Sequence, residues 1–151
     1  MKLPAINTPE RIAFDFLSAW QRKDYEAMFK LCQSTWVKTT ENAQQWLIDT
    51  FSQMDLKRFE IHHSYNATKN EAKKVTDAIA SNMVYVHIKI RFIIEEKTIN
   101  SEFSIVTIRE SAPFTPDVNG TWGVNPISTY RGLAWENRKD FTPIEIPEQK
   151  Q

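Results

Sequence analysis

VYVHIKIRF, residues 84–92, decides the fold class of this chain of 151 residues. Apolar side chains alternate with polar or aromatic ones along it, and a period of two is the pattern of a β-strand with one buried face. The inward positions are Val84, Val86, Ile88, Ile90 and Phe92, and the outward ones are Tyr85, His87, Lys89 and Arg91. The stretch therefore predicts a long strand whose apolar face packs against other elements.

Strands of the same kind are expected on either side of this stretch. One alternates at Phe59, Ile61, His63 and Tyr65. Another is expected from Ile99 to Arg109, and a β-bulge near Ile105 would explain a slip in its apolar parity. A last strand begins at Trp122, and Pro126 ends it because proline cannot donate to a ladder. We expect the chain after this proline to fold over the open end of the sheet.

Helical spacing dominates the chain before the first of these strands. Thr8 is a favourable N-cap, a proline follows it, and apolar residues then recur every four positions. A second helix is expected after Asp24. A third is expected after Thr39 or Thr40, with a brief strand at 35–37 before it. Helices followed by antiparallel strands indicate an α+β domain, which we expect as three N-terminal helices on a strongly curved antiparallel sheet, a half-open cone.

Length and composition suit one domain, which we expect over residues 1–133, with residues 134–151 as a polar tail, partly disordered. For residues 67–82 the sequence favours a loop that leads into a strand. Basic and acidic residues number 19 each, so no basic excess indicates nucleic-acid binding. No apolar run approaches the roughly 20 residues of a membrane span. The single cysteine, Cys32, is expected to be a buried inert thiol in a cytoplasmic protein.

The order of elements also supports a family resemblance. The run PERIAFDFLSAWQRKDYEAMFKLC at residues 9–32, then a helix, long strands and a closing GTWGV at residues 120–124, resembles the NTF2-like superfamily of SnoaL-like or cystatin-like α+β folds. The resemblance covers the chain from Thr8 to Tyr130. It implies a pocket between the helices and the concave sheet face, and dimers through the sheet are common. Because members include enzymes and binding or assembly modules, the resemblance does not choose a function.

The isomerases of that superfamily provide a residue-by-residue test. Where ketosteroid isomerases carry a tyrosine on the first helix, this chain has Phe16, which has no hydrogen-bond donor. The position of their carboxylate base holds Thr39 and Thr40, and that of their late-strand acid offers Ser104 or Thr107. All three roles are unfilled, which argues against this chemistry.

Dehydratase-like members use a histidine with a carboxylate, and His63 is the candidate for that role. Its parity with Phe59 and Ile61 predicts the concave face, where a neutral imidazole could act as a general base. The alternative is a histidine at the edge of the core, bonded to a backbone carbonyl or to Tyr65. Adjacent strand residues face opposite sides, so His62 and His63 are not expected to share a metal ion. We expect no metal site and no cofactor.

The aromatic residues leave open whether the cone is a filled core or a pocket, because buried aromatic side chains serve both purposes. The candidate ligand-binding residues are Phe16, Trp20, Trp46, Phe59, His63, Trp122 and Tyr130.

Three functions are compatible with this pattern. The first is a non-catalytic module that binds a small apolar or aromatic ligand in the cone. The second is a dehydratase- or isomerase-type enzyme that uses His63 as its general base. The third is a protein-binding assembly module. A homodimer is expected through the outward residues of the sheet, with no nucleic-acid or membrane partner.

Overall fold

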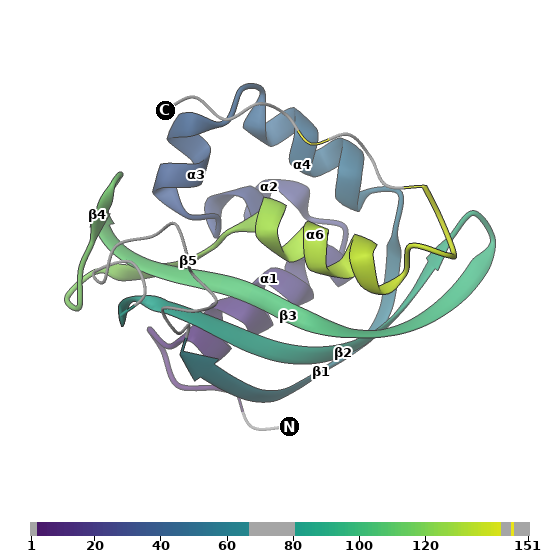
Figure 1. Ribbon diagram of the computed structural model, residues 1–151, viewed down its shortest axis with the longest axis horizontal. Helices are drawn as coiled ribbons and strands as arrows, with labels where there is room; N and C mark the ends of the chain where they lie inside the picture. Colours follow the sequence, from purple (N-terminus) through teal and green to yellow (C-terminus); the bar gives the residue numbers. More distant parts are fainter. Residues whose placement is uncertain (1–2, 67–80, 143–145, 147–151) are drawn as a thin grey trace.

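The structure, a computed structural model, describes residues 3–66, 81–142 and 146. Helices come first, strands follow, and a further helix closes the described part of the chain (Figure 1). In chain order the elements are α1 (Pro9–Gln21), α2 (Tyr25–Lys30), α3 (Ser34–Thr39), α4 (Ala43–Phe51), β1 (Asp55–Asn66), β2 (Met83–Ile94), β3 (Lys97–Ala112), β4 (Thr115–Pro116), β5 (Thr121–Val124) and α6 (Pro126–Glu136). The predicted α+β class is confirmed.

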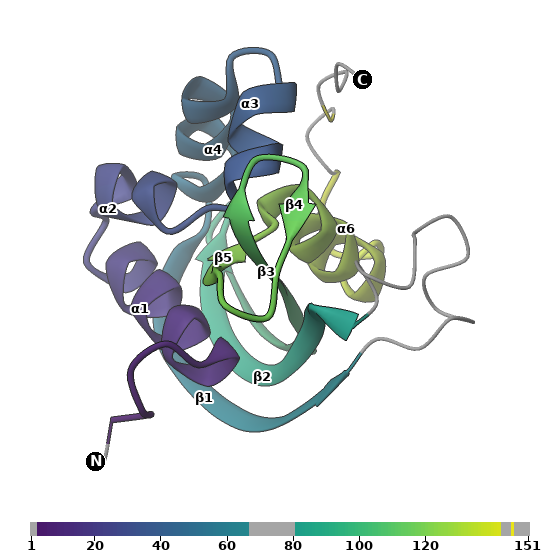
Figure 2. The ribbon, with the colours of Figure 1, turned by 90° about the vertical axis from the view of Figure 1, so that its left-hand side faces the viewer.

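The described strands form one antiparallel sheet of five, in the order β1-β2-β3-β4, with β5 also paired to β3. The described strands do not close into a barrel, so β1 is an edge strand. Helix α1 packs on β1 and β2, and α6 packs on β3. Figure 2 shows α1 and α6 over the same face of the sheet, with α3 and α4 farther from it. We call the opposite face of β1, β2 and β3 the outer face.

Strand β2 carries the alternation that its sequence predicts, with Val86, Ile88 and Phe92 fully buried. The bulge predicted near Ile105 is wrong, because the register from Met83 opposite Ile108 to Ile94 opposite Lys97 has no shift. Residues from Ile105 to Ile108 are buried on both faces of β3, and this double burial explains the slip in apolar parity.

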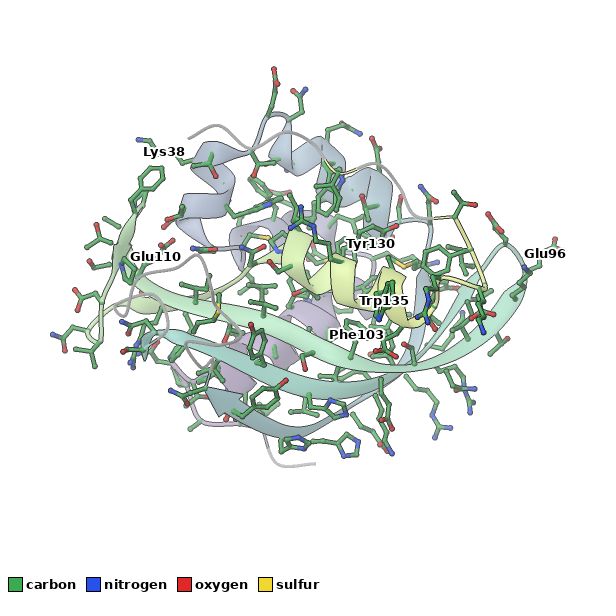
Figure 3. The ribbon with its side chains drawn as sticks, in the orientation of Figure 1. Lys38, Glu96, Phe103, Glu110, Tyr130 and Trp135 are labelled. Atoms are coloured by element: carbon green, nitrogen blue, oxygen red, sulfur yellow. The ribbon has the colours of Figure 1, made fainter. Side chains whose placement is uncertain are left out.

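The brief strand predicted at residues 35–37 is wrong, because these residues belong to α3. Glu110 lies near the C-terminal end of β3 (Figure 3). Its carboxylate accepts hydrogen bonds from groups at the start of this helix, where backbone N–H groups have no acceptor within the helix. One carboxylate oxygen accepts from the Thr35 amide at 2.8 Å and the Ser34 hydroxyl at 2.6 Å. The other accepts from the Thr35 hydroxyl at 2.7 Å and the Gln33 amide at 3.3 Å. In the described chain from residue 3, four helices therefore precede β1, rather than the three predicted. Helix α4 begins after Asn42 rather than after a threonine cap.

Helix α6 was not predicted from the sequence. Pro126 does end the strand, but it also opens the helix, with Asn125 as an N-cap that accepts from the Ser128 amide at 3.1 Å. The helix continues to Glu136, past the expected domain boundary at residue 133, and Ala134 on it is buried. The expected disorder at residues 148–151 lies outside the described residues.

Candidate functional site

The aromatic core holds four of the seven predicted ligand-binding residues. Phe51 on α4 makes edge-to-face contacts with Phe16 and Trp20, with ring centroids 5.7 and 5.1 Å apart. Tyr130 from α6, which is labelled in Figure 3, lies 6.3 Å from Phe51 and 5.9 Å from Trp46. All five rings are at most 7% exposed. These side chains are one another's packing partners, so their large area stabilises the fold.

Trp122 belongs to the same hydrophobic core and Phe59 packs against it, but each has a different side-chain partner. Trp122 on β5 packs under Arg109, whose Cζ is 4.7 Å from the ring centroid. Phe59 on β1 is half-buried and contacts Phe14 of α1, with centroids 5.6 Å apart. The structure therefore places Phe59 on the edge strand of the sheet, at the margin of the core.

His63 does not share a face with Phe59 and Ile61, and the prediction of its side is wrong. Ile61 lies opposite Ile88 and Ser64 opposite Val86, so both His62 and His63 lie opposite His87. This two-for-one pairing is a β-bulge, and it turns both histidines to the outer face. The His63 ring stacks on that of His87, with centroids 5.0 Å apart and planes at 20°.

Because of the bulge, all three histidines lie on one face of the sheet. The expectation that His62 and His63 face opposite sides, which was the reason against a shared metal ion, is therefore wrong. Within the described residues, no group of three histidine, cysteine, aspartate or glutamate side chains is arranged to hold a metal ion. Burial raises the pKa of the Cys32 thiol far above its ordinary value, as expected of an unreactive cysteine.

An apolar pocket of about 630 Å³ opens between the N-terminal segment, α1 and β1. Its lining is largely apolar, with a few polar tips, as is usual for small-molecule sites. The lining residues are Leu3, Pro4, Glu10, Phe14, Phe59, Glu60, Ile61 and His62. The pocket therefore includes Phe59 from the predicted set, and His62 in place of His63.

The polar groups of the apolar pocket are held in place by neighbouring strand residues. Glu10 accepts a hydrogen bond from the Ser64 hydroxyl at 2.5 Å. His62 Nε2 lies 3.3 Å from Glu60 Oε2 on the same strand. The spacing of Glu60 and His62, two residues apart on a strand, is the sequence signal that could have identified this pair.

A second cavity, which we call the basic groove, adjoins the apolar pocket and has a volume of about 940 Å³. Phe14, Phe59 and Glu60 line both cavities. The groove also takes in side chains of α1 and of three strands, most of them on the outer face, with Ile90 and Ser101 from the inner face. These further lining residues are Ser18, Gln21, Lys57, Arg58, Lys89, Ile90, Arg91, Asn100, Ser101 and Glu102. The groove presents four basic side chains against two acidic ones.

Both lysines of the basic groove form ion pairs with acidic side chains. Lys57 Nζ lies 2.7 Å from Asp55, and Lys89 Nζ lies 3.1 Å from Glu102. The hydrogen bond from Lys89, together with the charges of Lys89 and His87, holds the pKa of Glu102 below its usual range. Neither arginine of the groove forms an ion pair with a residue that the structure describes.

No helix in the described part of the chain is long and apolar enough to cross a membrane. No protein-family model matches the sequence, and no curated protein matches it significantly. The NTF2-like resemblance and the cone arrangement therefore stay predictions.

Proposed function

We propose that this protein is a non-catalytic module that binds a small apolar or aromatic molecule, and that the molecule occupies the apolar pocket at the edge of β1. The observation that carries this proposal is the pocket itself. Its volume of about 630 Å³ lies in the range of roughly 300–1,000 Å³ of small-molecule sites. Phe14 and Phe59 supply an edge-to-face aromatic wall, and Leu3 and Pro4 supply the facing apolar surface.

This location differs from the interior of the predicted half-open cone, because the aromatic residues expected there contact one another. The proposal keeps the predicted class of ligand and moves the site to the sheet edge. It does not depend on membership of the NTF2-like superfamily. It also leaves His63 without a catalytic role, because that ring stacks on His87 and does not line the apolar pocket.

The test is binding of neutral 1-anilinonaphthalene, a dye whose fluorescence rises in apolar surroundings, to the wild type and to Leu3→Asp. Leu3 is 52% exposed, so the substitution places a charge in the apolar pocket without disturbing the core. We expect affinity to fall about tenfold, as a side chain of this size allows. Ile6→Asp is the matched control, because Ile6 is 82% exposed and does not line the apolar pocket. Equal affinities of wild type and Leu3→Asp would overturn the proposal.

A second candidate function, assembly through the outer face, has an observation of its own. Tyr65 is 43% exposed, and its ring lies 5.3 Å from that of Tyr85 on the neighbouring strand. Aromatic side chains are enriched at protein interfaces, and an isologous dimer would bury Tyr65 against its copy. Light scattering tests this directly: the wild type should have a dimer mass and Tyr65→Glu a monomer mass. A monomeric wild type would exclude the predicted homodimer.

A further inference from the structure

The two arginines of the basic groove lie directly opposite one another. Arg58 on β1 and Arg91 on β2 are register partners, and both side chains are exposed on the outer face. Like charges directly across a strand pair destabilise a sheet. An anion between the two guanidinium groups would turn this repulsion into attraction.

The contacts of the pair leave donors available for such an anion. Arg91 Nε donates to the neutral Asn100 Oδ1 at 2.9 Å, so its charge is not compensated there. Arg58 makes no ion pair or side-chain hydrogen bond with any described residue. A guanidinium presents several N–H donors in a planar fork that matches the two oxygens of an anionic group.

We propose that the ligand is amphipathic: an apolar or aromatic body in the apolar pocket, with one anionic group held between Arg58 and Arg91 in the basic groove. This inference rests on the proposed function, because the shared residues Phe14 and Phe59 join the two cavities. Glu60 and Glu102 also line the groove, and their carboxylates repel additional negative charge. The ligand class is therefore a monoanion such as an aromatic or aliphatic carboxylate or a sulfonate, rather than a polyphosphate or a nucleic acid.

The experiment compares two dyes that differ by one anionic group. Neutral 1-anilinonaphthalene reports the apolar pocket alone, and 8-anilinonaphthalene-1-sulfonate adds a sulfonate. We expect the sulfonate dye to bind about tenfold more tightly, since an exposed charge-assisted contact has roughly that effect. The double variant Arg58→Gln/Arg91→Gln should lose this advantage and bind the neutral dye as before. Arg131→Gln, at an exposed arginine of α6, is the matched control and should keep the advantage.

The four outcomes separate the inference from the proposed function. An advantage for the sulfonate dye that requires the two arginines and falls at high ionic strength supports the inference. Equal binding of both dyes, lowered by Leu3→Asp, overturns the inference and leaves the apolar pocket. Binding of the sulfonate dye alone, through the arginines, supports the anion site and overturns the proposed function. Binding of neither dye overturns both.

Protein stability gives an independent readout that needs no dye. Because opposed like charges are relieved, Arg58→Gln should melt at or slightly above the temperature of the wild type in the absence of anion. A clear loss of stability would show that Arg58 has a structural partner. That result would overturn its assignment to an anionic ligand.

Discussion

Replacement of Glu110 tests how the sheet and the helices are joined. The carboxylate is 6% exposed and accepts four hydrogen bonds from the segment that opens α3. In Glu110→Ala the Ser34 and Thr35 hydroxyls can turn towards other acceptors, but the Thr35 amide and the Gln33 side-chain amide lose theirs. At roughly 1–3 kcal/mol for each buried donor left unsatisfied, the free energy of unfolding should fall by about 3 kcal/mol.

Urea denaturation, followed by tryptophan fluorescence and by circular dichroism, measures this change. Glu110→Gln keeps one acceptor oxygen and should lose about half as much stability as the alanine variant. Glu41→Ala, at an exposed position, is the control and should stay within about 0.5 kcal/mol of the wild type. The urea dependence of the unfolding free energy should not change, because the same surface is exposed on unfolding. A loss below about 1 kcal/mol in Glu110→Ala would refute the view that this carboxylate holds α3 in place.

Three further predictions concern buried hydroxyls, a surface carboxylate and a helix cap. Thr50 is 1% exposed and its hydroxyl makes no hydrogen bond with any residue that the structure describes, so Thr50→Val should raise the melting temperature. Thr129→Val should lower it, because that hydroxyl accepts a hydrogen bond at 3.1 Å and donates one at 2.8 Å; the opposite order of melting temperatures would contradict this account. Lys89→Met should raise the pKa of Glu102 towards its ordinary value, measured by NMR titration; because the folded-state pKa is lowered, the stabilisation is present at neutral pH and is lost as the pH falls through that pKa. Asn125→Ala removes the cap of α6 and should cost about 1 kcal/mol in thermal unfolding, and no loss would mean that the cap does not hold the helix.

Local patterns in the sequence were sufficient to predict several elements. Strand β2 was predicted because burial on one face imposes a period of two. Helix α1 was predicted because its cap is local: the Thr8 hydroxyl accepts from the Arg11 amide at 3.1 Å. The sequence left open whether the aromatic residues fill a core or line a pocket, and four of the seven candidates lie in the aromatic core.

Long-range contacts decided the elements that sequence reasoning missed. Helix α3 depends on Glu110, which lies 75 residues from Thr35, so no short window of sequence contains both partners. Helix α6 carried a local signal, an asparagine before a proline, that also fits the end of a strand. The face of His63 was missed because a bulge changes the pairing of β1 without a glycine or proline to mark it.

Only part of the candidate site could be predicted from the sequence, because the rest also depends on long-range contacts. Phe59 was predicted, but its partner Phe14 lies beside the apolar stripe of α1 and had no distinct pattern. Arg91 was assigned to the outer face, yet its position opposite Arg58 depends on a register shift between Leu56 and Arg58. The exact pairing of two strands is a property of the folded sheet that strand periodicity alone does not fix.

The bulge in β1 has a genetic consequence. Ile61, just before the bulge at His62 and His63, and Ser64, just after it, both lie on the face that the helices cover. Each is opposite a buried residue of β2, Ile88 and Val86 respectively. One histidine of the pair is thus supernumerary, and loss of a single codon at position 62 or 63 would leave an uninterrupted ladder from Arg58 to Asn66, with both flanks facing as before. Deletion of one codon within a strand usually reverses every side chain beyond it. Here it would change only the chemistry of the outer face, so this point in the gene can gain or lose an imidazole without altering the interior.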